Sequence, residues 1–299
     1  MSEPNIFIIN MKKSFQLLFA ATLVCSACIF TACENDDEIT ADEQLERQII
    51  GKWILTQSGG ADVLTDQKMV TTFKKTASGL KAYASVSSFV MPTMGQPDTA
   101  SQNQWKHMTE DDVRIENGKF IIETGDTLVS RRIEHYILES TASKLKLFTS
   151  VSMKLRGADL GGAVEHSEVW EKVNVDYSKD IIGTWEGWST GDQSRFDDGE
   201  PHHWEYLPDG TYKYYSLNKD SVWEEVPSVF NNYFVDGYLL CTRWKNTGAN
   251  DVENREWWEI ESITADTMKW IGKRQTYVME NGRMQIKENT ARFSMHRVK

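Results

Sequence analysis

The chain has 299 residues and a formal net charge of -11. This acidic balance argues against nucleic acid as a partner and against binding to anionic membrane surfaces through basic side chains. Only four cysteines are present, so a disulfide framework is not expected, and the folded part must rely on an apolar core.

The first 33 residues have the features of an export signal. Lys12 and Lys13 precede an apolar run over 15–32, and small residues precede Cys33. This pattern is typical of a cleaved secretory signal, and the run is short and mixed for a membrane span. Met11 is a more natural start than Met1, because the lysines of the signal follow it directly.

The segment around the expected cleavage point resembles the lipobox of bacterial lipoproteins. Residues 30–33 read Phe-Thr-Ala-Cys, with Phe in place of the usual Leu. The resemblance implies lipidation of Cys33 and a membrane anchor, with Cys25 and Cys28 as other acceptors and an ordinary cleaved signal as the alternative. Acidic residues at 34–38 resemble the surface-export signal of lipoproteins in some Gram-negative anaerobes, or form a solvated linker. We expect an outer-membrane location that faces the cell exterior.

An internal repeat divides the remainder of the chain. Residues 49–53 (Ile-Ile-Gly-Lys-Trp) return as 181–185 (Ile-Ile-Gly-Thr-Trp), and three further matches follow in the same order. These pair 115–120 with 234–239, 134–140 with 256–262, and 145–147 with 268–270. The period of about 130 residues is the size of a domain. We therefore predict a signal peptide (1–32), an acidic lipidated tether (33–40), a first domain (41–174), a linker (175–180) and a second domain (181–299).

Each repeat has the pattern of short strands joined by tight turns. Asn-Gly and Asp-Gly pairs at 117–118, 236–237 and 281–282 separate runs rich in Val, Ile, Thr and aromatic residues. A capping box that begins at Thr40 predicts one short helix before the first strand. The two-proline segment 91–103 reads as a loop. This pattern favours an antiparallel barrel or sandwich.

The Gly-x-Trp sequences at 51–53 and 183–185 resemble the opening of the first strand in lipocalins. The resemblance, which extends to lipocalin-like lipoproteins of Gram-negative anaerobes, implies an all-β fold of two tandem antiparallel up-and-down β-barrels. In that family the Trp closes one end of the barrel against an Arg. Arg292 or Arg297 is the candidate in the second domain, and only Lys172 is available in the first. The implied function is non-covalent binding of a small apolar or aromatic molecule.

Aromatic residues are concentrated in the second domain, and strand alternation predicts which of them point inward. The inward-facing set either fills the barrel or lines a ligand pocket, since both arrangements occur in small barrels. The same alternation points Trp257 outward. The predicted ligand-binding residues are Trp204, Tyr206, Tyr212, Tyr214, Trp258, Met268 and Trp270.

Motifs for catalysis, metal binding or cofactor binding do not stand out in the sequence. His202 and His203 are adjacent, so on a strand they face opposite ways. Glu224 and Glu225 are also adjacent, so on a strand they point to opposite faces and do not form the carboxylate pair of a glycosidase-like cleft. We expect a monomeric binding protein rather than an enzyme, with no metal and no cofactor. The alternative is a surface module that binds glycan or another envelope protein through exposed aromatics, Trp257 above all.

Overall fold

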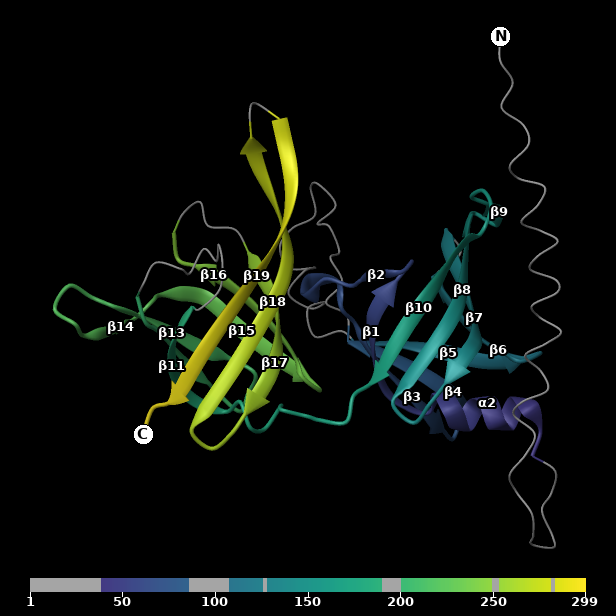
Figure 1. The fold of residues 1–299 in the computed structure, drawn as a ribbon, viewed down its shortest axis with the longest axis horizontal. Helices are drawn as coiled ribbons and strands as arrows, with labels where there is room; N and C mark the ends of the chain where they lie inside the picture. Colours follow the sequence, from purple (N-terminus) through teal and green to yellow (C-terminus); the bar gives the residue numbers. More distant parts are fainter. Residues whose placement is uncertain (1–38, 86–107, 126–127, 190–199, 249–252, 281–282) are drawn as a thin grey trace, which may run out of the picture. The chain divides into compact units, whose positions relative to one another are not determined.

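The computed structural model describes residues 39–85, 108–125, 128–189, 200–248, 253–280 and 283–299. Within these ranges the fold is all-β with two barrel-like sheets (Figure 1), as predicted. Helix α2 (Ala41–Ile49) occupies the position that the capping box indicated, and it buries Leu45 and Ile49. A single 3-10 turn, η1 (Thr65–Gln67), is also present. None of the helices in the described part has the length and apolar character of a membrane span.

The first sheet is a closed antiparallel barrel of eight strands. β10 pairs with both β8 and β1, which closes the ring, while the short strands β2 and β9 extend it. Leu45 and Ile49 of α2 join the core of this barrel. The strands are β1 (Gly51–Ser58), β2 (Ala61–Asp62), β3 (Val70–Thr76), β4 (Gly79–Ser85), β5 (Met108–Glu116), β6 (Lys119–Gly125), β7 (Val129–Ser140), β8 (Lys144–Leu155), β9 (Ala158–Asp159) and β10 (Val164–Lys172).

The second sheet curls in the same way but stays open between its two edge strands. Its order is β14-β13-β12-β11-β19-β18-β17-β16-β15, and an isolated bridge between Thr211 and Asn232 joins β13 to β15 at one end. The strands are β11 (Gly183–Ser189), β12 (His202–Tyr206), β13 (Tyr212–Leu217), β14 (Trp223–Glu225), β15 (Ser228–Asp236), β16 (Leu239–Asn246), β17 (Asn254–Ile263), β18 (Thr267–Glu280) and β19 (Arg283–Arg297).

The repeated Ile-Ile-Gly-x-Trp sequence has one structural explanation in both sheets. The indole Nε1 of Trp53 donates to the carbonyl of Ile49 at 2.8 Å, and Trp185 donates to Ile181 at 2.7 Å. All four of these side chains are almost fully buried. The motif therefore ties the start of the first strand to the segment before it, and both tryptophans are core residues.

The glycine of the motif is required by backbone conformation and by space. Gly183 has a φ of 128°, and a Cβ at this position would lie 2.3 Å from Nη1 of Arg297. The guanidinium of Arg297 passes over the glycine and lies 4.1 Å from the ring centre of Trp185. Arg297, rather than Arg292, is thus the residue that covers Trp185 at this end of the second sheet. In the first barrel Lys172 takes this place, with its Nζ 5.2 Å from the ring centre of Trp53.

The strand registers move one of the sequence matches by one residue. β7 pairs Ile137 with Leu147 before a bulge, and β17 pairs Ile260 with Trp270 before a bulge at the same point. Ile137 therefore corresponds to Ile260, whereas the sequence match paired residue 138 with residue 260. The sequence match aligned residues of similar type. The structural equivalence of the two strands depends instead on which side chains face inward.

Candidate functional site

All seven predicted ligand-binding residues lie in the core of the second sheet. Trp204, Tyr206, Tyr212, Trp258, Met268 and Trp270 are buried members of one apolar cluster, and Tyr214 packs against it. Their rings meet at tilted or edge-on angles, for example Trp204 and Trp270 with centroids 5.3 Å apart. Alternation along the strands thus identified the inward face of this sheet.

A pocket opens among these rings and leaves part of the interior unfilled. It has a volume of about 120 Å³ and is lined largely by aromatic side chains. Six of the seven predicted residues line it, and Met268 does not; Trp244 and Phe293 complete the aromatic wall. An apolar cavity of roughly 150 Å³ is enough to hold benzene. The pocket therefore has about the size of one six-membered ring.

The pocket lies at the seam where the second sheet fails to close. The amide of Val226 donates to the carbonyl of Tyr214 at 2.9 Å, and the next link across the seam is the bridge between Thr211 and Asn232. Two residues, 212 and 213, lie between these links on the β13 side of the seam. Five residues, 227–231, lie between them on the β15 side. The longer side must bow away, and Pro227 within it has no N–H to donate. Val226 and Asn231, at the ends of the bowed segment, line the pocket.

One charged side chain lines the pocket, and it is a carboxylate. Oε1 of Glu256 lies 3.4 Å from Nη1 of Arg274. The guanidinium of Arg274 lies 4.1 Å from the ring centre of Trp258 and donates to the carbonyl of Trp257 at 3.0 Å. Arg274 therefore offsets the charge of Glu256 and holds one face of Trp258. Sequence reasoning missed Glu256, although its alternation with Trp258 and Ile260 on β17 placed it on the inward face.

Two polar atoms of the pocket wall have no hydrogen-bond partner among the described residues. They are the hydroxyl of Tyr206 and Nε1 of Trp270, and both atoms are buried. Burial raises the pKa of Tyr206 well above its usual range, with Tyr212, Tyr233 and Glu256 acting in the same direction. The hydroxyl therefore stays protonated. Both atoms are hydrogen-bond donors, and both belong to residues that line the pocket.

Trp257 is far less exposed than we predicted for an outward-facing aromatic residue. This side chain points out of the second sheet, as predicted, but only 6% of it is exposed. It packs in a separate apolar cluster that also contains Ile54 and Leu239. Trp257 is thus a packing residue and offers no surface to a glycan. Trp188 is 44% exposed and stacks on His296, with centroids 6.2 Å apart.

The interior of the first barrel carries a buried polar cluster beside its aromatic core residues Phe73, Phe120 and Trp170. Glu168 accepts a hydrogen bond from Nε1 of Trp170 at 2.8 Å and lies 2.9 Å from Nε2 of His166. His135 is bonded to the hydroxyl of Thr149 at 2.9 Å and stacks on Phe120. Burial lowers the pKa of His135 to about 4, against the opposing attraction of Glu168. This cluster is internally satisfied, so it packs the barrel.

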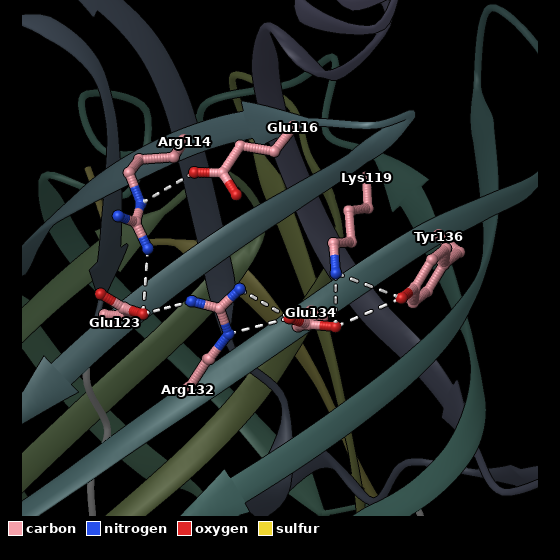
Figure 2. A network of polar contacts seen from close by, with 7 residues as sticks. All are labelled: Arg114, Glu116, Lys119, Glu123, Arg132, Glu134 and Tyr136. Carbon is pink, nitrogen blue, oxygen red and sulfur yellow. Dashed lines mark hydrogen bonds and ion pairs between the residues drawn. The ribbon is translucent and has the colours of Figure 1, made fainter.

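The outer face of the first barrel carries an ion-pair network over β5, β6 and β7 (Figure 2). Glu123 pairs with Arg114 at 3.0 Å and also with Arg132, whose Nε donates to Glu134 at 2.8 Å. Glu134 in turn accepts from Lys119 at 2.8 Å. Positive and negative groups alternate along this face, and the pairs are at least partly exposed. We read the network as a solvated surface rather than a binding site.

Only some of the remaining residues singled out from the sequence lie in the part of the chain that the structure describes. Cys33 and the segment with Asn281 lie outside the described residues. His202 is buried against Tyr214 while His203 faces the other way, as alternation required. Cys241 is buried, and burial raises its pKa well above the usual range, so it acts as a small apolar residue. Among the described residues no group of three or more His, Cys, Asp or Glu side chains is placed to hold a metal ion.

Comparison with known proteins does not assign the chain to a family. No family model matches it, and no curated protein matches it. A solved structure similar to it is the crystal structure of a "putative outer membrane protein" from Bacteroides fragilis, with 8% sequence identity. That match covers 85% of this chain and 99% of the other, with a TM-score of 0.20. A score this low does not relate the two folds.

Proposed function

We propose that this chain is a lipid-anchored protein of the cell envelope that binds a small apolar or aromatic molecule in the pocket of its second sheet. The observation that carries the proposal is that six of the seven residues chosen from strand alternation line one partly open pocket. Concave, mostly aromatic pockets with a few polar groups are the usual form of a small-molecule site. The role we propose is non-covalent binding, which suits a pocket wall made largely of aromatic side chains.

The binding test uses intrinsic tryptophan fluorescence of the fragment Ala41–Lys299. This fragment holds all three core clusters and forms one compact unit. We expect saturable quenching or a blue shift with members of a panel of neutral aromatics, fatty acids, bile acids and haem. Trp244→Ala should weaken the response at least several-fold, because Trp244 lines the pocket and is only partly buried.

Trp188→Ala is the matched control, since Trp188 is exposed on the outer side of the second sheet. It should leave the affinity unchanged. An equal loss in both variants, or no response to any compound, would contradict the pocket as the binding site.

The anchor is tested separately by metabolic labelling with palmitate in a Gram-negative host. Wild type should incorporate label, and Cys33→Ser should abolish it, because lipid is attached to the cysteine at the cleavage point. Cys28→Ser is the control and should leave labelling intact. Label that depends on Cys28 would move the cleavage point upstream, and no label in wild type would remove the anchor from the proposal.

A second candidate function rests on aromatic side chains of the outer face, some exposed and some half-buried. The exposed pair Trp188 and His296 forms one stack. The half-buried ring of His203 has its centroid 5.0 Å from that of Trp223 and 4.9 Å from that of Tyr215. Flat rings of this kind stack on sugars. Affinity electrophoresis in gels containing polysaccharide would test this role, with retardation expected in wild type and lost in Trp188→Ala. Unchanged migration of wild type in every gel would dismiss it.

A further inference from the structure

The unpaired donors in the pocket wall carry information about the ligand that the aromatic rings alone do not. A buried hydroxyl or indole N–H without a partner is unfavourable, so native proteins keep few of them. Here two such atoms, the hydroxyl of Tyr206 and Nε1 of Trp270, belong to residues that line the same pocket. Both are donors, and neither has a partner among the described residues.

Neighbouring polar groups in the same wall are bonded, which sets these two apart. The hydroxyl of Tyr214 lies 2.7 Å from Nδ1 of His202, and the hydroxyl of Tyr233, packed beside Tyr206, donates to the carbonyl of Leu207 at 2.7 Å. The hydroxyl of Thr242 points to the carbonyl of Glu256 at 3.4 Å. The surrounding tyrosines thus complete their hydrogen bonds within the protein, whereas Tyr206 does not.

Charge restricts the group that can meet these donors. Glu256 is the charged residue of the pocket wall, and the Arg274 that pairs with it does not line the pocket. A ligand carboxylate would meet no cationic side chain in the pocket wall, and an unpaired charge costs free energy in a partly buried site. An uncharged carbonyl, ether or hydroxyl oxygen accepts hydrogen bonds without that cost.

We propose that the pocket selects an uncharged ring compound that carries an acceptor oxygen, which the Tyr206 hydroxyl and the Trp270 indole N–H bind. This inference rests on the proposed function and specifies its ligand class. The ring occupies the space of about 120 Å³ between the aromatic walls.

The experiment compares two probes of nearly the same shape, acetophenone and ethylbenzene, on the fragment Ala41–Lys299. Ethylbenzene has a methylene group where acetophenone has its carbonyl. Chemical-shift titration gives both Kd values, and their ratio removes effects that the two probes share. In wild type we expect acetophenone to be preferred and to shift the indole N–H resonance of Trp270 downfield, while ethylbenzene leaves that resonance near its free position.

Tyr206→Phe removes the one hydroxyl and keeps the ring. We expect this variant to lower the preference for acetophenone about tenfold, to leave the Kd of ethylbenzene unchanged, and to melt no lower than wild type without ligand. The matched control is Tyr214→Phe, which also removes a hydroxyl from the pocket wall, but one already bonded to His202. It should lose some thermal stability and keep the preference.

The outcomes separate this inference from the proposed function. Binding of both probes with the same Kd ratio in wild type and Tyr206→Phe overturns the inference and leaves the binding pocket standing. A marked loss of thermal stability in Tyr206→Phe also overturns it, because the hydroxyl would then have a structural partner. Binding of neither probe, nor of any compound in the fluorescence panel, overturns both proposals.

Discussion

The two sheets repeat one design but fill the same interior positions with opposite chemistry. When β7, β8 and β10 are aligned with β17, β18 and β19 on their shared bulge, His135 corresponds to Trp258 and Thr149 to Gly272. The cross-strand partners extend this match, so that Glu168, opposite Leu147, corresponds to Phe293, opposite Trp270. One barrel buries a bonded polar cluster where the other presents aromatic walls.

Space explains how the second sheet accommodates its larger rings. A Cβ at Gly272 would lie 3.1 Å from Cε3 of Trp258, so a side chain there would displace the indole. In the first barrel Thr149 occupies the corresponding position and bonds His135. The second sheet fills this site with a large ring beside glycine. The first barrel fills it with a smaller ring beside threonine. The comparison shows that a duplicated scaffold can keep its closure motif while its interior diverges.

The largest expected effect comes from exchanging this pair. Gly272→Thr should destabilise the second sheet by about 1–3 kcal/mol through overpacking against Trp258. Trp258→His should cost about 3 kcal/mol through lost aromatic packing. The double variant restores the combination found in the first barrel, so we expect it to cost at least about 1 kcal/mol less than the sum. Urea unfolding measures all three, and strict additivity would contradict the proposed equivalence of the two sites.

The next effect is a pH dependence that arises from His135 in the first barrel. His135 has a folded-state pKa of about 4, whereas an unperturbed histidine titrates near 6.5. Between these values the unfolded chain binds a proton that the folded chain does not, so stability falls as the pH drops from about 6.5 to 4. The loss is about 2–3 kcal/mol.

Hydrogen exchange read on peptides from β7 and β8 reports this loss at pH 7 and at pH 4.5, after correction for the intrinsic exchange rate. His135→Gln keeps a neutral polar group beside Thr149 and should abolish most of the difference. Peptides from β17 and β18, where Trp258 replaces the histidine, serve as the internal control. A pH response of equal size in both sets of peptides would show that His135 is not its source.

A smaller loss of stability is expected where a basic side chain covers the tryptophan of the Gly-x-Trp sequence in each sheet. Arg297 donates to the carbonyls of Asp180, Ile182 and Ala265 in addition to stacking on Trp185. Arg297→Met should therefore cost about 2 kcal/mol, since hydrogen bonds from charged groups are among the stronger ones. Lys172→Met should cost less than about 1 kcal/mol, because its contact with Trp53 is a single cation–π interaction at 5.2 Å. Denaturant midpoints of the two variants test this order, and equal losses would contradict it.

The smallest effect is expected in the outer network of Figure 2. Glu134 is partly buried and bonds to both Lys119 and Arg132, which hold its pKa below the usual range. Even so, Glu134→Gln should cost no more than about 1 kcal/mol, because solvent and salt screen such pairs. Thermal unfolding at low and high salt should show the difference shrinking as salt rises. A loss of several kcal/mol would mean that this face is covered by something that excludes water.

Much of the fold was readable in the chain because it depends on local patterns. Period-two alternation placed Trp204, Tyr206, Trp258 and Trp270 on one inward face, and the Asn-Gly pair at 117–118 marked a hairpin at the end of β5. The repeated Ile-Ile-Gly-x-Trp sequence marked the start of each sheet. Each of these features is decided by residues near one another in the chain, so sequence alone determined it.

Other features were decided only when distant segments came together. Strand alternation predicted that Trp257 points outward. Its burial depends on packing with Ile54, which lies about two hundred residues earlier in the chain. The choice of Arg297 over Arg292 depends on where β19 meets Gly183. The pocket exists because the chain between Val226 and Asn232 is too long to close the seam beside β13. Side-chain direction is a local property, whereas closure and empty space are properties of the whole packed sheet.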